Sequence, residues 1–286
     1  MKKNILVTGG AGFIGSNLCK ELSKSHKVWS IDNYSNGSEE NHYNGVVYIN
    51  DNTININKHF SKNQFDYIFH LGEYARVEQS FEDFGKVLSY NYHSFPKVVE
   101  FAKNKNAKLI YSGSSTKFSV GKEDGKSMSP YAYTKAQNTE FLKNYSLWYG
   151  LKYTIVYFYN AYGDDEVSDG KYATVIAKFL KLRLDGDKTL PVTKPGTQVR
   201  NFTHIDDIIS GLVVAGFEGS GDEFGIGSDE KYSILDVVKL LDCKPVFIPE
   251  KKGNRNDGVL KTDKLKKLGW SAKKSLRDYL TSKLKN

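Results

Sequence analysis

The sequence predicts an α/β fold in which a doubly wound parallel sheet is followed by a smaller, mixed α/β C-terminal region. Apolar runs of strand length alternate with helical segments over the first half of the chain, which is the order of a parallel sheet with helices on both faces. The fourth run, 65–71, is almost entirely apolar, as a strand covered on both faces requires. The alternation loosens after residue 163. We therefore expect one domain at 1–163 and a second region at 164–286, some of whose segments return to the first domain.

The first elements are a strand, a glycine-rich turn, a helix and a second strand, which together span Asn4 to Asp32. A short apolar run stops at the glycine cluster, and apolar residues then recur near helical spacing. Gly9 permits a tight turn, Gly12 permits backbone N–H groups to approach a pyrophosphate, and Gly15 permits the helix to lie close on the strand. The positive end of that helix would face the phosphates. This order predicts a dinucleotide site of the Rossmann type.

Asp32 lies 17 residues after Gly15, at the end of the second apolar run. Its carboxylate there could accept hydrogen bonds from an adenosine ribose, and it would repel a 2′-phosphate, so the sequence favours NAD over NADP. Asp51 follows a third short strand and could bind the adenine amino group. A role in capping its own loop is the close alternative for Asp51.

The remaining elements follow in order along the chain. Strands are expected at 46–49, 65–71, 107–112 and 152–159, and helices at 81–103, 131–149, 172–184, 206–217 and the C-terminus. A loop at 120–130 leads into the helix at 131–149, and Gly150 ends that helix.

Tyr131 and Lys135 are four residues apart, so they share one face of the helix after the fifth strand. A lysine ammonium beside a phenol stabilises the phenolate, and a base of this kind can remove a proton from a hydroxyl. Ser114, at the end of the fifth strand, could reach the substrate oxygen and Tyr131 together. Surface packing is the alternative for the pair. A turn role is the alternative for Ser114, because Ser112 and Ser115 are adjacent candidates.

Several motifs occur in one order over nearly the whole chain: Thr-Gly-Gly-Ala-Gly-Phe-Ile-Gly, Asp32-Asn-Tyr-Ser-Asn-Gly, His70-Leu, Tyr131-x-x-x-Lys135, Asn160-Ala-Tyr-Gly, Arg200-Asn-Phe-Thr-His-Ile-Asp-Asp and Leu268-Gly-Trp270. In these motifs the chain resembles the extended short-chain dehydrogenase/reductase family, specifically its nucleotide-sugar epimerases and dehydratases. The resemblance implies a Rossmann fold, a substrate-binding C-terminal region and a place in polysaccharide biosynthesis.

The resemblance also implies roles for individual residues. The catalytic set would be Ser114, Tyr131 and Lys135. Residues binding NAD would be Gly9, Gly12, Phe13, Ile14, Gly15, Asp32, Asn33, Asp51, Asn52, Leu71, Gly72, Tyr131 and Lys135. Residues binding a nucleoside-diphosphate sugar would be Glu73, Ser115, Asn160 and Arg200, and an arginine fork suits phosphate oxygens.

The sequence departs from the family pattern at several positions. Glu73 stands in His70-Leu-Gly-Glu73, where a pair of small residues is usual, and could contact a sugar hydroxyl or amine or cap a helix. Tyr157 replaces a common arginine, and Lys251 or Lys252 replaces another near the nucleotide pocket. The segment between the fifth strand and the next helix is also short. These departures leave the sugar and the nucleotide base open.

Ser115 and Thr116 occupy the positions where dehydratases of the family carry an Asp-Glu pair. Neither hydroxyl can serve as that acid and base, so 4-epimerisation through a 4-keto sugar is the leading hypothesis. A 4-oxidase or 4-ketoreductase that exchanges its nicotinamide is a second hypothesis, and a non-catalytic NAD-binding protein is a third.

The composition fits a globular, cytoplasmic protein of 286 residues, with 39% hydrophobic and 26% charged residues. Two cysteines, Cys19 and Cys243, are too few for a disulfide framework or a metal knot, and Cys19 is expected in the core. The net charge is +8. The lysines lack interleaved aromatic residues, which argues against nucleic acid and suits anionic small molecules. No apolar run reaches membrane-spanning length.

The helices expected at 81–103 and 131–149 carry many aromatic residues. These are Tyr90, Tyr92, Phe95, Phe101, Phe141, Tyr145 and Trp148. The resemblance implies a homodimer in which two such helices of each subunit pair, and packing on their own sheet is the alternative.

Overall fold

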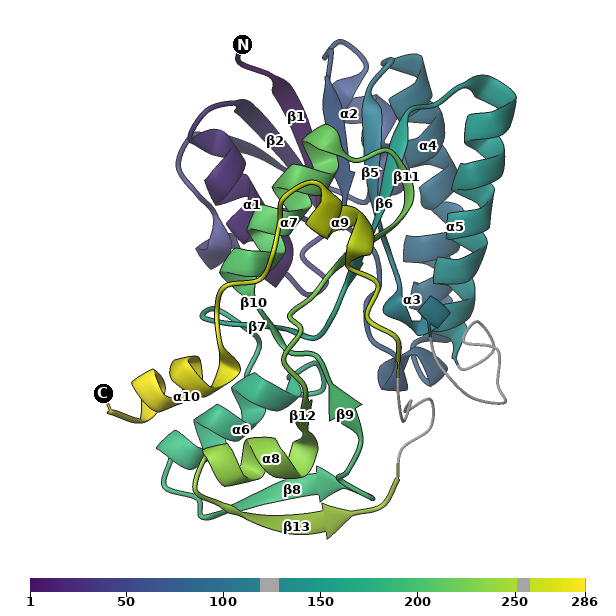
Figure 1. The fold of residues 1–286 in the computed structure, drawn as a ribbon. Helices are drawn as coiled ribbons and strands as arrows, with labels where there is room; N and C mark the ends of the chain where they lie inside the picture. Colours follow the sequence, from purple (N-terminus) through teal and green to yellow (C-terminus); the bar gives the residue numbers. More distant parts are fainter. Residues whose placement is uncertain (119–128, 251–257, 286) are drawn as a thin grey trace.

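The computed structural model describes residues 1–118, 129–250 and 258–285 (Figure 1). Lys251, Lys252 and most of the loop expected at 120–130 lie outside these ranges. No helix in the described ranges is long and apolar enough to cross a membrane.

Seven parallel strands form the central sheet, in the order β11-β6-β5-β4-β1-β2-β3. The strands are β1 (Asn4–Thr8), β2 (Lys27–Asp32), β3 (Val46–Asn50), β4 (Tyr67–His70), β5 (Lys108–Gly113), β6 (Tyr153–Phe158) and β11 (Gly221–Ile226). The chain order reverses between β1 and β4. In an open α/β sheet, ligands bind beyond the carboxyl ends of the strands at such a switch point. The predicted doubly wound sheet is confirmed.

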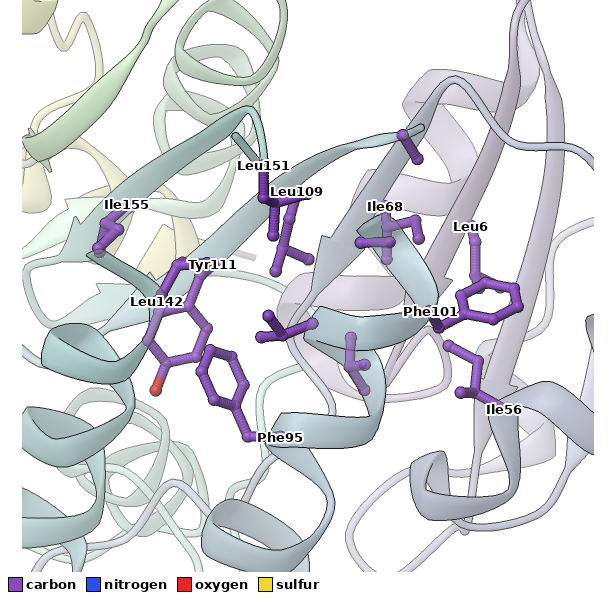
Figure 2. Close-up of a cluster of buried hydrophobic side chains, with 14 of the residues drawn as sticks. Leu6, Ile56, Ile68, Phe95, Phe101, Leu109, Tyr111, Leu142, Leu151 and Ile155 are labelled. Carbon is purple, nitrogen blue, oxygen red and sulfur yellow. The ribbon is translucent and has the colours of Figure 1, made fainter. Parts of the chain in front are cut away.

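Helices cover both faces of the sheet (Figure 1). One face packs against α1 (Phe13–Ser23), α7 (Ile205–Glu218) and α9 (Asp263–Lys267), and the other against α2 (Ile56–Phe60), α4 (Phe95–Asn104) and α5 (Pro130–Tyr149). Cys19 is fully buried on the first face, which confirms its expected place in the core. Figure 2 shows the second face, where Phe95 and Tyr111 pack among aliphatic side chains.

The helix expected at 81–103 is interrupted. It consists of η3 (Glu78–Phe81), α3 (Phe84–Val87), a π-helical segment η4 (Leu88–His93) and α4. The buried side chain of Asn91 lies in the π segment and bonds both the N–H and the carbonyl of Tyr74. π-helical turns are frequent near functional sites, and periodicity alone gives no sign of this one.

A second region lies beyond the carboxyl ends of the strands (Figure 1). It contains α6 (Val175–Leu184), α8 (Ile234–Leu240), α10 (Leu276–Lys285) and three two-stranded sheets. The sheets pair β7 (Ala161–Tyr162) with β10 (Thr203–His204), β9 (Val199–Arg200) with β12 (Tyr232–Ser233), and β8 (Thr189–Thr193) with β13 (Lys244–Ile248). The remaining short helices are η1 (Glu39–Asn41), η2 (Thr53–Asn55) and η5 (Ser115–Phe118).

Two elements after residue 163 belong to the main sheet and the helices that cover it. Strand β11 extends the main sheet beside β6, and α7 packs on its face. A division of the chain near residue 163 into a cofactor domain and a substrate region therefore stays a proposal about function.

Candidate active site

A cavity of about 370 Å³ lies at the switch point, beyond the carboxyl ends of β1 and β4. It is lined by every residue that the sequence assigned to the cofactor except Asp51. It also extends to Lys135 and Tyr131 on α5. One continuous space thus joins the glycine turn to the proposed base.

The glycines at the floor of this cavity lack a side chain for different physical reasons. Gly9 has a φ of +74°, and a Cβ on it would lie 2.7 Å from the Cα of Gly72. A Cβ on Gly15 would overlap the carbonyl of Gly9. A Cβ on Gly12, in contrast, would meet only the Gly9 oxygen at an ordinary 3.5 Å. Packing therefore explains two of the glycines, and Gly12 instead leaves room above the start of α1, where no side chain caps the helix and a pyrophosphate fits.

Asp32 is 8% exposed and lines the same cavity. Its carboxylate accepts hydrogen bonds from the N–H groups of Ala11 (2.9 Å) and Tyr34 (2.8 Å). These bonds orient it at the end of β2, where a ribose would lie.

Asp51 does not line the cavity. Its carboxylate accepts from Asn55 (2.8 Å), contacts His59 Nε2 at 2.6 Å, and lies 3.6 Å from the ammonium of Lys58. The hydrogen bonds from His59 and Asn55 lower the pKa of Asp51. The neighbouring Asn52 does line the cavity. These contacts favour the loop-capping interpretation of Asp51, and its contact with adenine stays a prediction.

A second cavity of about 770 Å³ opens between the sheet and the second region. Its lining includes the predicted substrate residues Ser115, Asn160 and Arg200, together with Ser114. Tyr131 lines both cavities. The phenol therefore stands where a cofactor in the first space and a substrate in the second would meet.

Tyr131 is held by the start of α5. The Ser129 side chain caps this helix by accepting from the N–H of Ala132, and Pro130 occupies its first turn. On the strand side, the hydroxyl of Ser114 lies 2.8 Å from that of Thr116. Thr116 therefore orients Ser114. From the sequence, Thr116 was considered only as a position where dehydratases of the family carry an acidic residue.

Lys135 lies one turn after Tyr131 and is almost fully buried. Its ammonium is 2.5 Å from Glu73 Oε2 and donates to the carbonyl of Ser112 at 2.6 Å. Burial opposes ionisation of Glu73. The charge of Lys135 and the contact with His70 outweigh burial, so the pKa of Glu73 lies below its ordinary value. Glu73 thus contacts Lys135 of the predicted catalytic set, and its own role at the sugar stays a prediction.

The sequence interpretation missed Arg76 and Glu166, which both line the cofactor cavity. Arg76 donates twice to the carbonyl of Tyr172. The carboxylate oxygens of Glu166 are buried, and in the described ranges neither accepts a hydrogen bond of normal geometry. Burial raises the pKa of Glu166 to about 7, against the opposing influence of Thr174, Gly163 and Arg76. Neither residue belongs to a periodic pattern. Arg76 follows β4 closely, however, and the rule that ligands bind beyond the carboxyl ends of parallel strands could have indicated it.

Comparison with known proteins agrees with this geometry. A profile of the NAD dependent epimerase/dehydratase family matches residues 5–227.

The chain belongs to this family.

Family members of several activities resemble it. The UDP-N-acetyl-alpha-D-glucosaminuronate decarboxylase of Bacillus cytotoxicus is 33% identical over 276 residues, which cover 88% of this chain and 85% of that protein. The UDP-glucose 4-epimerase of Thermotoga maritima, solved with UDP-glucose, has a TM-score of 0.91 at 28% identity and covers 99% of this chain and 97% of its own.

A third relative was solved with its cofactor. The UDP-glucuronic acid 4-epimerase of Bacillus cereus, in complex with UDP-glucuronic acid and NAD, has a TM-score of 0.87 at 26% identity, and covers 99% of this chain and 98% of its own. NAD is the cofactor of the family, and the cavity residues of this chain fit it: a glycine turn open to a pyrophosphate and an acidic residue at the ribose.

Proposed function

We propose that this member of the family is a nucleoside-diphosphate-sugar 4-epimerase that recycles its NAD. The observation that carries the proposal is the position of Tyr131, which lines both the cofactor cavity and the larger second cavity. A base there can act on a sugar hydroxyl that faces the nicotinamide end of the cofactor cavity.

The chain's own residues divide the work as follows. Tyr131 takes the proton from the C4 hydroxyl and later returns it. Ser114, oriented by Thr116, hydrogen-bonds the same oxygen. Lys135 stabilises the phenolate electrostatically. Bound NAD supplies a hydride acceptor that becomes a donor on the return step, so the net redox change is zero.

Substrate binding falls to the second cavity. Arg200 and Asn160 line it, and Lys178 adds a further cation on α6. A guanidinium and an ammonium are suited to a diphosphate. The volume of about 770 Å³ leaves room for a 4-keto sugar to turn over and present its other face.

A second candidate is decarboxylation of a nucleoside-diphosphate uronate. The 33% identity to the Bacillus cytotoxicus decarboxylase favours it. Oxidation at C4 by bound NAD, with the same tyrosine as the base, would place a ketone β to the carboxylate and so activate the carboxylate for loss as carbon dioxide. Dehydration is a poorer candidate because Ser115 and Thr116 provide no acid and base.

A panel of substrates tests the proposal. The purified enzyme is incubated with UDP-, GDP- and dTDP-sugars and the corresponding uronates, without added cofactor, and the products are separated by chromatography. A new epimer of unchanged mass supports the proposal. A product lighter by carbon dioxide indicates the decarboxylase. Conversion that requires added NAD or NADH, with a stoichiometric change in NADH, indicates an oxidoreductase, and no reaction with or without added cofactor despite tight NAD binding indicates a binding protein.

We also propose that the protein is a homodimer formed through α5 and the π segment η4. Leu147 and Trp148 at the end of α5 are 82% and 65% exposed, and Tyr92 on η4 is 49% exposed. The two elements contact each other, and in the proposed dimer both present exposed apolar side chains to the second subunit. By contrast, Phe95 and Phe101 are fully buried on their own sheet. The cytoplasmic location and the role in polysaccharide biosynthesis stay predictions.

A further inference from the structure

A buried acid lies against the lysine of the proposed catalytic set. The side chains of Glu73 and Lys135 are 1% and 4% exposed, and the ion pair between them measures 2.5 Å. An ammonium buried without a partner tends to lose its proton, because burial disfavours the charged form. Whether the ammonium of Lys135 keeps its proton therefore depends on the groups that surround it.

The carboxylate of Glu73 is fully engaged by the protein. Oε2 contacts Lys135 and accepts from the hydroxyl of Tyr111 at 3.1 Å, and Oε1 accepts from the amide of Asn138 at 2.9 Å. Burial, followed by the charge of Glu73, raises the pKa of Tyr111 well above its usual value, so Tyr111 stays a neutral donor. Glu73 is thus held as an acceptor at both oxygens, turned toward the lysine.

His70 continues this network to β1. The Thr8 hydroxyl accepts from the N–H groups of Leu71 and Gly72 and lies 2.7 Å from His70 Nδ1. Its own proton is therefore available to Nδ1, and this assigns the ring hydrogen to Nε2. Nε2 faces Glu73 Oε1 at 3.4 Å. The N–H edge of the ring is thus directed at the Glu73 carboxylate. Thr8 on β1, His70 and Glu73 form a chain of contacts that ends at Lys135.

The donors of Lys135 can be counted. An ammonium has three N–H groups. One is directed at Glu73 and one at the carbonyl of Ser112 (2.6 Å). The ammonium also lies 5.0 Å from the ring centre of Tyr111. The hydroxyl of Ser112 lies at 3.5 Å as a longer third contact. These contacts fix the ammonium in place at the edge of the cofactor cavity, which Lys135 lines.

We propose that Glu73 is a positioning residue: its buried carboxylate keeps the Lys135 ammonium charged and fixed at the edge of the cofactor cavity. This role rests on the proposed function only for its kinetic consequence, in which Lys135 supports Tyr131 as base. Among the described residues, the titratable groups around Lys135 are Glu73, Tyr111, His70 on the far side of Glu73 and, one turn away, Tyr131.

Competitive acetylation of the intact apoenzyme tests the pairing without any sugar. Acetic anhydride attacks only the neutral amine, so the pH midpoint for acetylation of Lys135, followed by peptide mass spectrometry, reports its protonation. In Glu73→Gln we expect the midpoint to fall by about one to three pH units, because the opposing charge is lost. In Glu73→Asp, which keeps the charge, we expect it to stay near the wild-type value.

Asp222→Asn is the matched control. Asp222 also binds a lysine and a tyrosine hydroxyl, with Lys117 and Tyr157 each at 2.6 Å, but it does not line either cavity. This variant should leave the Lys135 midpoint unchanged. If Glu73→Gln does not fold, Glu73→Asp and the double variant Glu73→Gln/Lys135→Met keep the test open. The double variant, which removes both charges, should fold, and its failure to fold would contradict the pairing.

Kinetics then separate this role from substrate contact. We expect Glu73→Gln to lower kcat by about tenfold or more with little change in KM, and Glu73→Asp to restore part of it. An unchanged Lys135 midpoint together with a raised KM for the sugar would overturn the proposal and make Glu73 a substrate residue. A shifted midpoint in a protein that converts no nucleotide sugar would uphold the pairing and reject the proposed function.

Discussion

The carboxylate of Glu73 and the ammonium of Lys135 lie 2.5 Å apart in the interior, at the junction of the sheet and α5. A buried pair of this kind contributes little net stability, yet removing one partner is costly, because an uncompensated charge remains. The charge of Lys135 therefore depends on Glu73, which lies in the segment after β4. The following predictions test this and the other parts of the site.

Tyr131 is the proposed base, so Tyr131→Phe should lower turnover by about two to four orders of magnitude. NAD affinity should remain close to that of the wild-type protein, because the phenol is one of many residues around the cofactor cavity. Steady-state kinetics and NAD titration measure the two effects. Tyr133→Phe, on the exposed side of the same helix, is the control and should be fully active. Normal turnover by Tyr131→Phe would rule out the assigned mechanism.

Gly12 and Gly15 should respond differently to alanine. Gly12→Ala should leave the Tm of the apoenzyme nearly unchanged and weaken NAD binding by at least about tenfold, because the added methyl has room in the protein but takes the space of the pyrophosphate. Gly15→Ala should lower the apoenzyme Tm, since its Cβ would overlap the Gly9 carbonyl. Thermal unfolding and calorimetry distinguish them. Equal losses of Tm would contradict this division of roles.

Glu166 should make the stability of the apoenzyme depend on pH. Its folded-state pKa of about 7 exceeds its usual 4.5, so the folded protein holds this proton more tightly than the unfolded chain. The stability that this proton provides is lost as the pH rises from about 4.5 through 7. Glu166→Gln should therefore exceed the wild-type stability at pH 8, by at most about 3.5 kcal/mol, and should lose that advantage near pH 4.5. A difference that is constant across this range would refute the burial of an uncompensated carboxyl.

The proposed dimer face gives a test by light scattering. The wild-type protein should be a dimer at micromolar concentration, and Trp148→Glu should be a monomer, because a charge at the centre of a buried apolar contact is costly. Phe247→Glu on β13, another exposed aromatic site in the second region (48%, against 65% for Trp148), should remain dimeric. A monomeric wild-type protein would reject the proposal.

Most of the sheet could be predicted from the sequence, because β1, β2, β4, β5 and β6 are largely buried and appear as apolar runs. The edge strand β11, Gly-Asp-Glu-Phe-Gly-Ile, contains no such run and was not expected as a strand. The second apolar run, expected to end at Asp32, is β2 and ends there, and the helix expected at 131–149 begins one residue earlier as α5. The prediction of one continuous helix at 81–103 was wrong in its middle, where the hydrogen bonds between Asn91 and Tyr74 accompany a π segment. A tertiary contact of this kind has no periodic signature.

The candidate site was predictable only where a motif fixes it. The glycine turn and the Tyr131–Lys135 spacing indicated residues that do meet at one cavity. The direction of Glu73 was not predictable, because it depends on how the chain leaves β4 and on the partners Tyr111 and Asn138 from two other elements. Arg76 and Glu166 come together in the fold from segments far apart in the chain.

The most direct test of the proposed epimerase uses a substrate, identified from the panel, that carries deuterium at C4. The enzyme is incubated with it and with an excess of free unlabelled NADH, and the epimer is analysed by NMR and mass spectrometry. A cofactor that is recycled in place predicts that the deuterium stays at C4 of the inverted sugar. Deuterium in the free NADH pool, or an epimer that carries hydrogen at C4, would contradict the proposed mechanism.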